Sequence, residues 1–151
     1  MIHCIGDSHV CFFSGEDKIE ATDIMPYFRT YRIGPSTAQA AILKRDVIEA
    51  TIKTVAKPGD MILFGFGEID CRVHLLKQSE KHKQSLEDVV HDCVENYFKL
   101  FQMAKQYGFP LLAWNVPPSS RDKIECGEYS TYGTCKQRNE ISQLFNAALR
   151  R

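Results

Sequence analysis

The sequence lacks an excess of charge of either sign, and it lacks any long apolar run. Its 19 lysines and arginines balance its 19 aspartates and glutamates, so no basic surface for nucleic acid or anionic membranes is expected. No stretch approaches the roughly 20 apolar residues of a membrane-spanning helix, and the first residues have neither the basic start nor the apolar core of a secretory signal. We therefore expect a cytoplasmic protein with no membrane partner and no nucleic-acid partner.

The six cysteines include no C-x-x-C pair, which argues against a zinc ribbon and against a thioredoxin-like motif. A chain of 151 residues that is 44% hydrophobic is long and apolar enough to fold as a single domain, residues 1–151, without disulfide staples. Reduced thiols are expected. Cys126 and Cys135 share one polar loop, and whether they pair stays open.

Sequence motifs for cofactors and metals are missing as well. Gly65 and Gly67 lack the third glycine of a dinucleotide fingerprint, and there is no Walker A sequence. His9 and His74 are not spaced from acidic residues as in zinc motifs such as H-E-x-x-H. No cofactor and no bound metal are therefore expected.

Short apolar runs are the main structural signal in the sequence. They predict buried strands at residues 2–5, 61–64 and 109–114. Residues 28–33 alternate aromatic and arginine side chains, which predicts an edge strand, whereas the uncharged run 2–5 is expected in the centre of the sheet.

Amphipathic helices are predicted between and after these strands. The first covers about residues 36–56, and the others begin at Ser85 and Thr134, each with residues suited to an N-terminal cap. Strands that alternate with such helices indicate an α/β fold with a parallel sheet covered by helices on both faces. The polar residues 77–84 are predicted as a solvated turn, and 116–133 as a long loop. The sequence ends at a helix where the alternation calls for another strand. Either the fold is unusually short or the domain is C-terminally incomplete, and we expect the second.

Polar segments follow the predicted strands, and parallel strands bring such segments to one edge of a sheet. Asp7, Ser8 and His9 follow the first strand, Gly34 precedes the first long helix, and residues 67–72 follow the strand at 61–64. We expect the three segments to line one pocket. The Ser8 hydroxyl and backbone N–H suit a nucleophile met by main-chain donors. The alternative is that Asp7 or Ser8 only caps the segment that follows the strand.

The third segment carries Glu68, Asp70 and Arg72, which alternate along the chain. If the segment is extended, the three side chains lie on one side. There they would contact a polar substrate together with Asp7, His9 and Gly67, or they would form an ion-pair network that only pins the loop.

These blocks together resemble the SGNH (GDSL) hydrolase superfamily: Gly6-Asp7-Ser8 after an N-terminal strand, a lone Gly34, and the glycine–acid block from Gly67 to Arg72. The third block is similar to a divergent branch of the superfamily. The resemblance implies a flavodoxin-like three-layer α/β/α fold, here with four strands and the last one missing. It also implies that Ser8 is the nucleophile of acyl-ester hydrolysis or acyl transfer, and that the N–H groups of Ser8 and Gly34 form part of an oxyanion hole.

The sequence departs from the family pattern at two points. The third block has no asparagine in the position of the family's G-x-N-D motif, so Arg72 substitutes for that oxyanion donor or the donor is absent. No histidine follows His91, so the D-x-x-H block that supplies the catalytic acid and base is missing. His9 is expected to point away from Ser8, because neighbours on an extended segment face opposite sides.

The expected function is therefore that of an SGNH-like esterase or acyltransferase acting on a small or carbohydrate-linked acyl ester. This chain is expected to be weakly active by itself, and a chain extended through a D-x-x-H segment is expected to be active. Two alternatives stay open: a non-catalytic module that binds a polar or carbohydrate ligand, and an interaction domain of a larger protein. The sequence does not indicate an oligomeric state.

Overall fold

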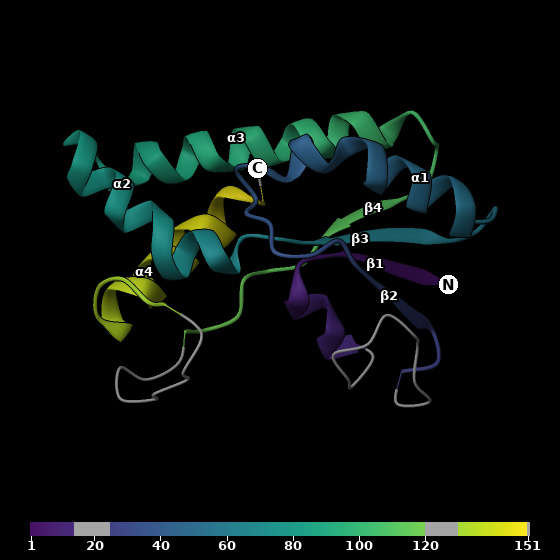
Figure 1. Cartoon of the computed structure of the whole chain (residues 1–151), viewed down its shortest axis with the longest axis horizontal. Helices are drawn as coiled ribbons and strands as arrows, with labels where there is room; N and C mark the ends of the chain where they lie inside the picture. The colour runs from purple at the N-terminus through teal and green to yellow at the C-terminus, as the bar shows by residue number, and fades with distance from the viewer. Residues whose placement is uncertain (14–24, 120–129, 151) are drawn as a thin grey trace.

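A four-stranded, fully parallel sheet forms the centre of the protein (Figure 1). The computed structural model describes residues 1–13, 25–119 and 130–150. The strands lie in the order β2-β1-β3-β4 and span Ile2–Gly6 (β1), Phe28–Arg32 (β2), Met61–Gly65 (β3) and Leu111–Ala113 (β4). These are the first four positions of the flavodoxin-like order 2-1-3-4-5. The predicted α/β fold is confirmed, with β1 inside the sheet and β2 at its edge.

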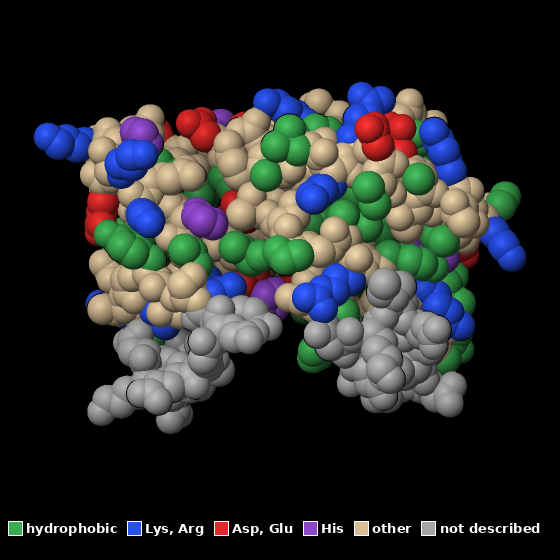
Figure 2. Space-filling view, in the orientation of Figure 1, with side chains coloured by type: hydrophobic (Ala, Val, Ile, Leu, Met, Phe, Trp, Pro, Cys, Tyr) green, Lys and Arg blue, Asp and Glu red, His purple; other side chains and the backbone are tan. Residues whose placement is uncertain are grey.

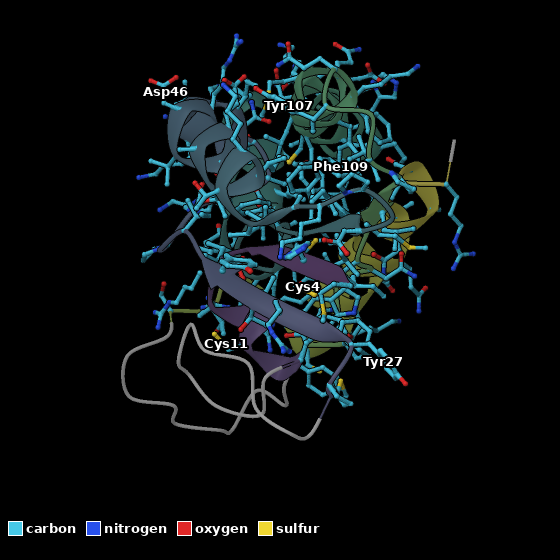
Figure 3. The ribbon with its side chains drawn as sticks, turned by 90° about the vertical axis from the view of Figure 1, so that its right-hand side faces the viewer. Cys4, Cys11, Tyr27, Asp46, Tyr107 and Phe109 are labelled. Carbon is cyan, nitrogen blue, oxygen red and sulfur yellow. The ribbon has the colours of Figure 1, made fainter. Side chains whose placement is uncertain are left out.

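Helices connect and cover the strands. Their bounds are Ser8–Phe13 (η1), Ala41–Lys44 (η2), Arg45–Val55 (α1), Asp70–His74 (η3), Leu75–His82 (α2), Leu86–Lys105 (α3) and Cys135–Ala148 (α4). In Figure 1, α1 and α3 lie along one face of the sheet and η1 lies against the other. Figure 3 shows the same two sides: the labelled Cys11 of η1 lies across the sheet from Asp46 and Tyr107. No helix in the described part of the chain is long and apolar enough to cross a bilayer.

The two faces of the sheet carry cores of unequal size. The larger core lies on the side of α1, α3 and α4, and includes Ile62, Phe64 and Leu100, each 0% exposed. The smaller one joins Leu63 of β3 to η1 and to a few aromatic side chains, among them Phe13. Ile62 and Leu63 are neighbours on β3, so the alternation of side chains along a strand separates the two cores.

The connection from β2 to α1 differs from the sequence prediction. The predicted helix over 36–56 begins only at Arg45, after the short η2. Ser36 forms no capping box with Gln39; instead, Thr37 Oγ1 accepts the N–H of Ala40 at 3.1 Å. The cause is the distant Asp70 carboxylate, which accepts the N–H groups of Ala38 at 2.6 Å and Gln39 at 3.4 Å and holds this stretch as a turn.

The polar stretch at 77–84, predicted as a turn, belongs mostly to the helix α2. It continues the helical turn η3, it is anchored by the buried Leu75, and it ends at Lys83, which has a φ of 54°. The cap residues of the other two predicted helices were enough to locate where those helices begin. Ser85 caps α3 through the N–H of Asp88, and Thr134 forms a complete capping box at the start of α4.

Candidate functional site

The ends of β1 and β3 place the candidate site at the centre of the sheet's carboxyl edge. In a flavodoxin-like sheet the strand order reverses between these two strands, and ligands bind in the crevice at that point. Gly6 and Gly65 face each other there, and a Cβ on Gly6 would overlap the carbonyl oxygen of Gly65. The close approach lets the N–H of Asp7 donate to that carbonyl oxygen at 3.2 Å.

Asp7 caps the turn that follows β1. Its side chain is 1% exposed, and its Oδ1 accepts the backbone N–H of His9 at 2.8 Å and the ring Nδ1–H of His9 at 2.9 Å. The residues after Asp7 form the 3-10 helix η1 rather than an extended segment. The extended segment on which we based the expectation that His9 points away from Ser8 is therefore not present; His9 lines the pocket, and its ring Nε2 lies 3.4 Å from Glu68 Oε2.

Glu68 and Arg72 form the next link of the same network. Residues 68–74 are helical, so the prediction of an extended segment with Glu68, Asp70 and Arg72 on one side is wrong. A helical turn instead pairs residues four apart, and Arg72 Nε donates to Glu68 Oε1 at 2.7 Å. Arg72 also donates to the carbonyl oxygen of Ser130.

Asp70 lies away from this network, in the interior. It is 1% exposed, its carboxylate holds the turn after β2, and Cys93 Sγ lies 3.5 Å from its Oδ1. Burial raises its pKa, against the opposing effect of the backbone N–H groups that it accepts. Asp70 is thus part of the fold, outside the pocket into which we expected it to point.

The environment of His9 favours its charged form. The hydrogen bond to Asp7 is the largest influence and raises the pKa of His9; attraction to Asp7 and Glu68 adds to it, while partial burial and the Arg72 charge oppose it. Two carboxylates, an imidazole and a guanidinium alternate in space as Asp7, His9, Glu68 and Arg72. With the ring protonated, their formal charges sum to zero.

A narrow pocket lies beside this network. Its wall includes Asp7, His9, Glu68 and Trp114, and its volume of about 10 Å³ holds one water-sized group. A wider groove of about 550 Å³ adjoins it and lies between the segment after β4 and the helix α4. Both hollows share the wall formed by residues 114–117.

Two carboxylate oxygens of this network have no hydrogen-bond partner among the residues that the structure describes. They are Asp7 Oδ2 and Glu68 Oε2, both shielded from solvent. Nε2 of His9 is within ion-pair distance of the glutamate oxygen, but the contact does not have hydrogen-bond geometry. A buried acceptor without a donor is costly, so each oxygen is a place where a ligand's N–H or O–H group would be stabilised.

Ser8 and Gly34 lie next to this pocket but outside its lining. Ser8 is half-buried at the first residue of η1, and its hydroxyl has no partner within residues 1–13, 25–119 and 130–150. The N–H of Ile33 donates to the Gly6 carbonyl oxygen at 2.8 Å, which brings Gly34 to the start of the Asp7–Ser8 turn. Gly34 has a φ of 92°, a conformation that favours glycine.

Gly67 also has a positive φ. It packs closely against Phe145, and this contact sets the path of the backbone into the helical residues 68–74.

Only one of the chain's five histidines reaches the pocket. His3 is held between Tyr31 and Asp60 at the opposite edge of the sheet. His74 lines a separate hollow with Ser36, and His82 and His91 are exposed on their helices. His9 is therefore the imidazole nearest to Ser8 in the chain, and both of its ring nitrogens face carboxylates.

No cysteine that the structure describes lines the pocket or the groove. Cys4, Cys71 and Cys93 are buried thiols, and burial raises the pKa of Cys4 to about 12, which keeps it protonated and unreactive. Cys126, whose pairing with Cys135 was left open, lies outside the described residues. Where the chain is described, no three His, Cys, Asp or Glu side chains are grouped to hold a metal ion.

Sequence reasoning missed the groove wall after β4. Asn115 is the second residue after that strand and Gln143 lies on α4, and both line the groove. The rule that ligands bind beyond the carboxyl ends of parallel strands would have pointed to Asn115, whereas no local pattern marks Gln143. Comparison with family models, curated proteins and solved structures gives no match for this chain.

Proposed function

We propose that the protein is a serine-dependent acyl-ester hydrolase or acyltransferase with Ser8 as its nucleophile. The observation that carries the proposal is the position of the Gly6-Asp7-Ser8 turn, which ends a central strand at the switch point of a flavodoxin-like sheet. The Ser8 hydroxyl has no competing partner among the residues that the structure describes.

The reaction needs few groups. Ser8 Oγ bonds to the ester carbonyl carbon while its proton passes to water, and the carbonyl oxygen becomes an oxyanion next to the backbone N–H groups of Ser8 and Gly34. The C–O bond to the alcohol then breaks and the alcohol leaves with a proton. Water or a second alcohol takes the acyl group from Ser8, which gives hydrolysis or acyl transfer.

The proposed site predicts a low rate for this 151-residue chain. A serine hydroxyl needs a base to take its proton, and both ring nitrogens of His9, the imidazole nearest to Ser8, face carboxylates, with the hydrogen bond to Asp7 raising the pKa of the ring. A general base contributes roughly 10²–10⁴-fold to such reactions. The same observation favours the second candidate function, a non-catalytic module that binds a polar ligand in the same pocket.

Acetylation of Ser8 separates the two candidates. The chain is mixed with p-nitrophenyl acetate, p-nitrophenol release is recorded, and the acetylated peptide is located by mass spectrometry. We expect slow release, an acetyl group on the Ser8 peptide, and loss of both in Ser8→Ala. Ser36→Ala, a buried serine after β2, is the matched control and should behave as wild type. Release that is unchanged in Ser8→Ala, with no acetyl group on that peptide, would rule out the serine mechanism.

A further inference from the structure

A hollow of about 360 Å³ lies between the connection from β2 to α1 and the helical turn η3. It shares no lining residue with the narrow pocket or the wider groove, so it is a separate hollow. Its volume is within the range of small-molecule sites. Figure 2 shows the face of the molecule over which this connection runs, where apolar side chains lie between histidine, lysine and arginine side chains. The hollow is therefore a candidate site for a ligand that the proposed ester chemistry does not use.

The two walls of this hollow are tied to each other in the interior. Asp70 belongs to η3, and its buried carboxylate accepts the N–H groups of Ala38 and Gln39 in the connection, at 2.6 and 3.4 Å. His74 is the last residue of η3 and lines the hollow from that side. Because a buried carboxylate holds one wall on the other, the hollow exists before a ligand binds, which limits the entropy lost on binding.

The wall of the hollow carries cationic side chains and no carboxylate. Lys44 and His74 line it, whereas no aspartate or glutamate does. Lys44 forms no ion pair with any residue in the described part of the chain. The Asp70 carboxylate attracts His74, but it is buried and engaged by backbone N–H groups. An anionic group in the hollow would thus be attracted by the Lys44 ammonium and by a protonated His74, with no competing carboxylate in the wall.

Two hydroxyl groups in the same wall can donate to such a group. Thr37 Oγ1 accepts the N–H of Ala40 at 3.1 Å, and this contact leaves its own O–H free to donate. The Ser36 hydroxyl makes a long contact of 3.4 Å with the carbonyl oxygen of Thr37. Carboxylate and phosphate oxygens accept several hydrogen bonds each, and those bonds are stronger than bonds between neutral groups.

The rest of the wall is apolar. It consists of Pro35, Ala40, Leu43 and Ile69. Leu43 is 83% exposed, which makes it the most exposed large hydrophobic side chain in the described part of the chain. A ligand with an apolar body would remove part of this surface from water, and that burial is favourable. A bare anion would bind the polar part of the wall and leave the apolar part uncovered.

We infer that this hollow, called the Lys44 hollow below, binds a small amphipathic anion. A carboxylate or phosphate group lies at Lys44, His74 and the two hydroxyl groups, and the apolar body of the ligand lies against Leu43 and Ile69. The inference goes beyond the proposed function and does not depend on it, since Ser8 does not line this hollow.

A methyl group in the wall gives the readout. Protein with ¹³C-labelled isoleucine methyl groups is titrated with benzoate, phenyl phosphate, inorganic phosphate and benzyl alcohol. Ile69 reports on the hollow, and Ile62, buried in the large core, is the internal reference. We expect a saturable shift of the Ile69 signal with benzoate or phenyl phosphate and none at Ile62. The neutral benzyl alcohol and inorganic phosphate should each bind at least tenfold more weakly, and the tighter of the two aromatic anions identifies the preferred head group.

One variant and a matched control locate the anionic group. Lys44 is exposed, so Lys44→Gln should fold normally, and it should weaken binding of the aromatic anion about fivefold. Lys81→Gln makes the same change on the exposed side of α2, outside the hollow, and should bind as the wild type does. Ser8→Ala should also bind as the wild type does, whatever its effect on p-nitrophenyl acetate.

Three outcomes would overturn the inference. The first is no saturable shift of Ile69 with either aromatic anion, and the second is binding that Lys44→Gln leaves unchanged. The third is equally tight binding of benzyl alcohol or inorganic phosphate, which would show that the hollow does not recognise an anionic and an apolar part together. None of the three depends on whether Ser8 is the nucleophile, so the two proposals fail separately.

Discussion

His9 links the stability of the protein to pH through two carboxylates. Its pKa in the folded protein is raised by Asp7 and Glu68, so folding stabilises the protonated ring. That contribution is fully present below the unfolded pKa of about 6.5. It is lost as pH rises through the higher pKa of the folded state.

The substitution His9→Gln tests this link. The difference in the free energy of unfolding between wild type and variant should be largest near pH 6 and should shrink toward pH 9, as measured by urea denaturation. His82→Gln, an exposed histidine on α2, should show no such trend. A difference for His9→Gln that stays constant across this range would show that the ring is not charged by its neighbours.

At the same scale, the candidate site was only partly predictable. Asp7 and Glu68 were found because they lie within three residues after the ends of β1 and β3, and the carboxyl-edge rule needs only the strand positions. The role of Asp70 was not predicted. Its side chain points into the interior because residues 68–74 form a helical turn, whereas the alternating charged residues suggested an extended segment. Gln143 carries no local signal, since the partner wall of its groove comes from a segment more than 20 residues earlier.

At the scale of elements, local chemistry explains the boundaries that the sequence predicted. The cap residues Ser85 and Thr134 bond N–H groups three residues away, so a short window contains the whole interaction. The late start of α1 is the opposite case. The carboxylate that holds residues 38 and 39 belongs to Asp70, 32 residues away from Ala38, and no window around residue 38 contains it.

The capping box of α4 gives the prediction for this scale. Thr134 accepts the N–H of Gln137, and the Gln137 side chain accepts the N–H of Thr134 at 2.8 Å. Thr134→Ala removes the first acceptor and should lower the free energy of unfolding by about 1 kcal/mol in urea denaturation. Thr131→Ala, an exposed threonine three residues earlier, should cost only a few tenths of a kcal/mol. Equal effects of the two substitutions would mean that the box does not stabilise the helix.

For the whole molecule, the unequal cores imply unequal stability on the two sides of the sheet. The side with α1, α3 and α4 holds most of the buried apolar side chains, whereas η1 is held mainly by Val10 and Phe13. Elements with few buried contacts open more readily than the core. The segment that carries Ser8 and His9 therefore lies on the less stable side of the sheet. The strand β3 contributes side chains to both cores.

Neighbouring residues on β3 test this asymmetry, because their side chains enter different cores. Ile62 is 0% exposed within the large core, so Ile62→Ala leaves a cavity that cannot collapse and should cost about 4 kcal/mol. Leu63 is 8% exposed in the small core, where η1 can move inward, so Leu63→Ala should cost about 2 kcal/mol.

Amide hydrogen exchange adds the spatial part of the same prediction. Leu63→Ala should speed exchange in η1 well beyond its effect on α3, because only η1 loses its packing partner on β3. Ile62→Ala should instead speed exchange in β1, β3 and α3 together, since it lowers the stability of the unit that unfolds last. If both variants accelerate η1 and α3 equally, the two cores unfold as one, and the turn that carries Ser8 is as rigid as the centre of the sheet.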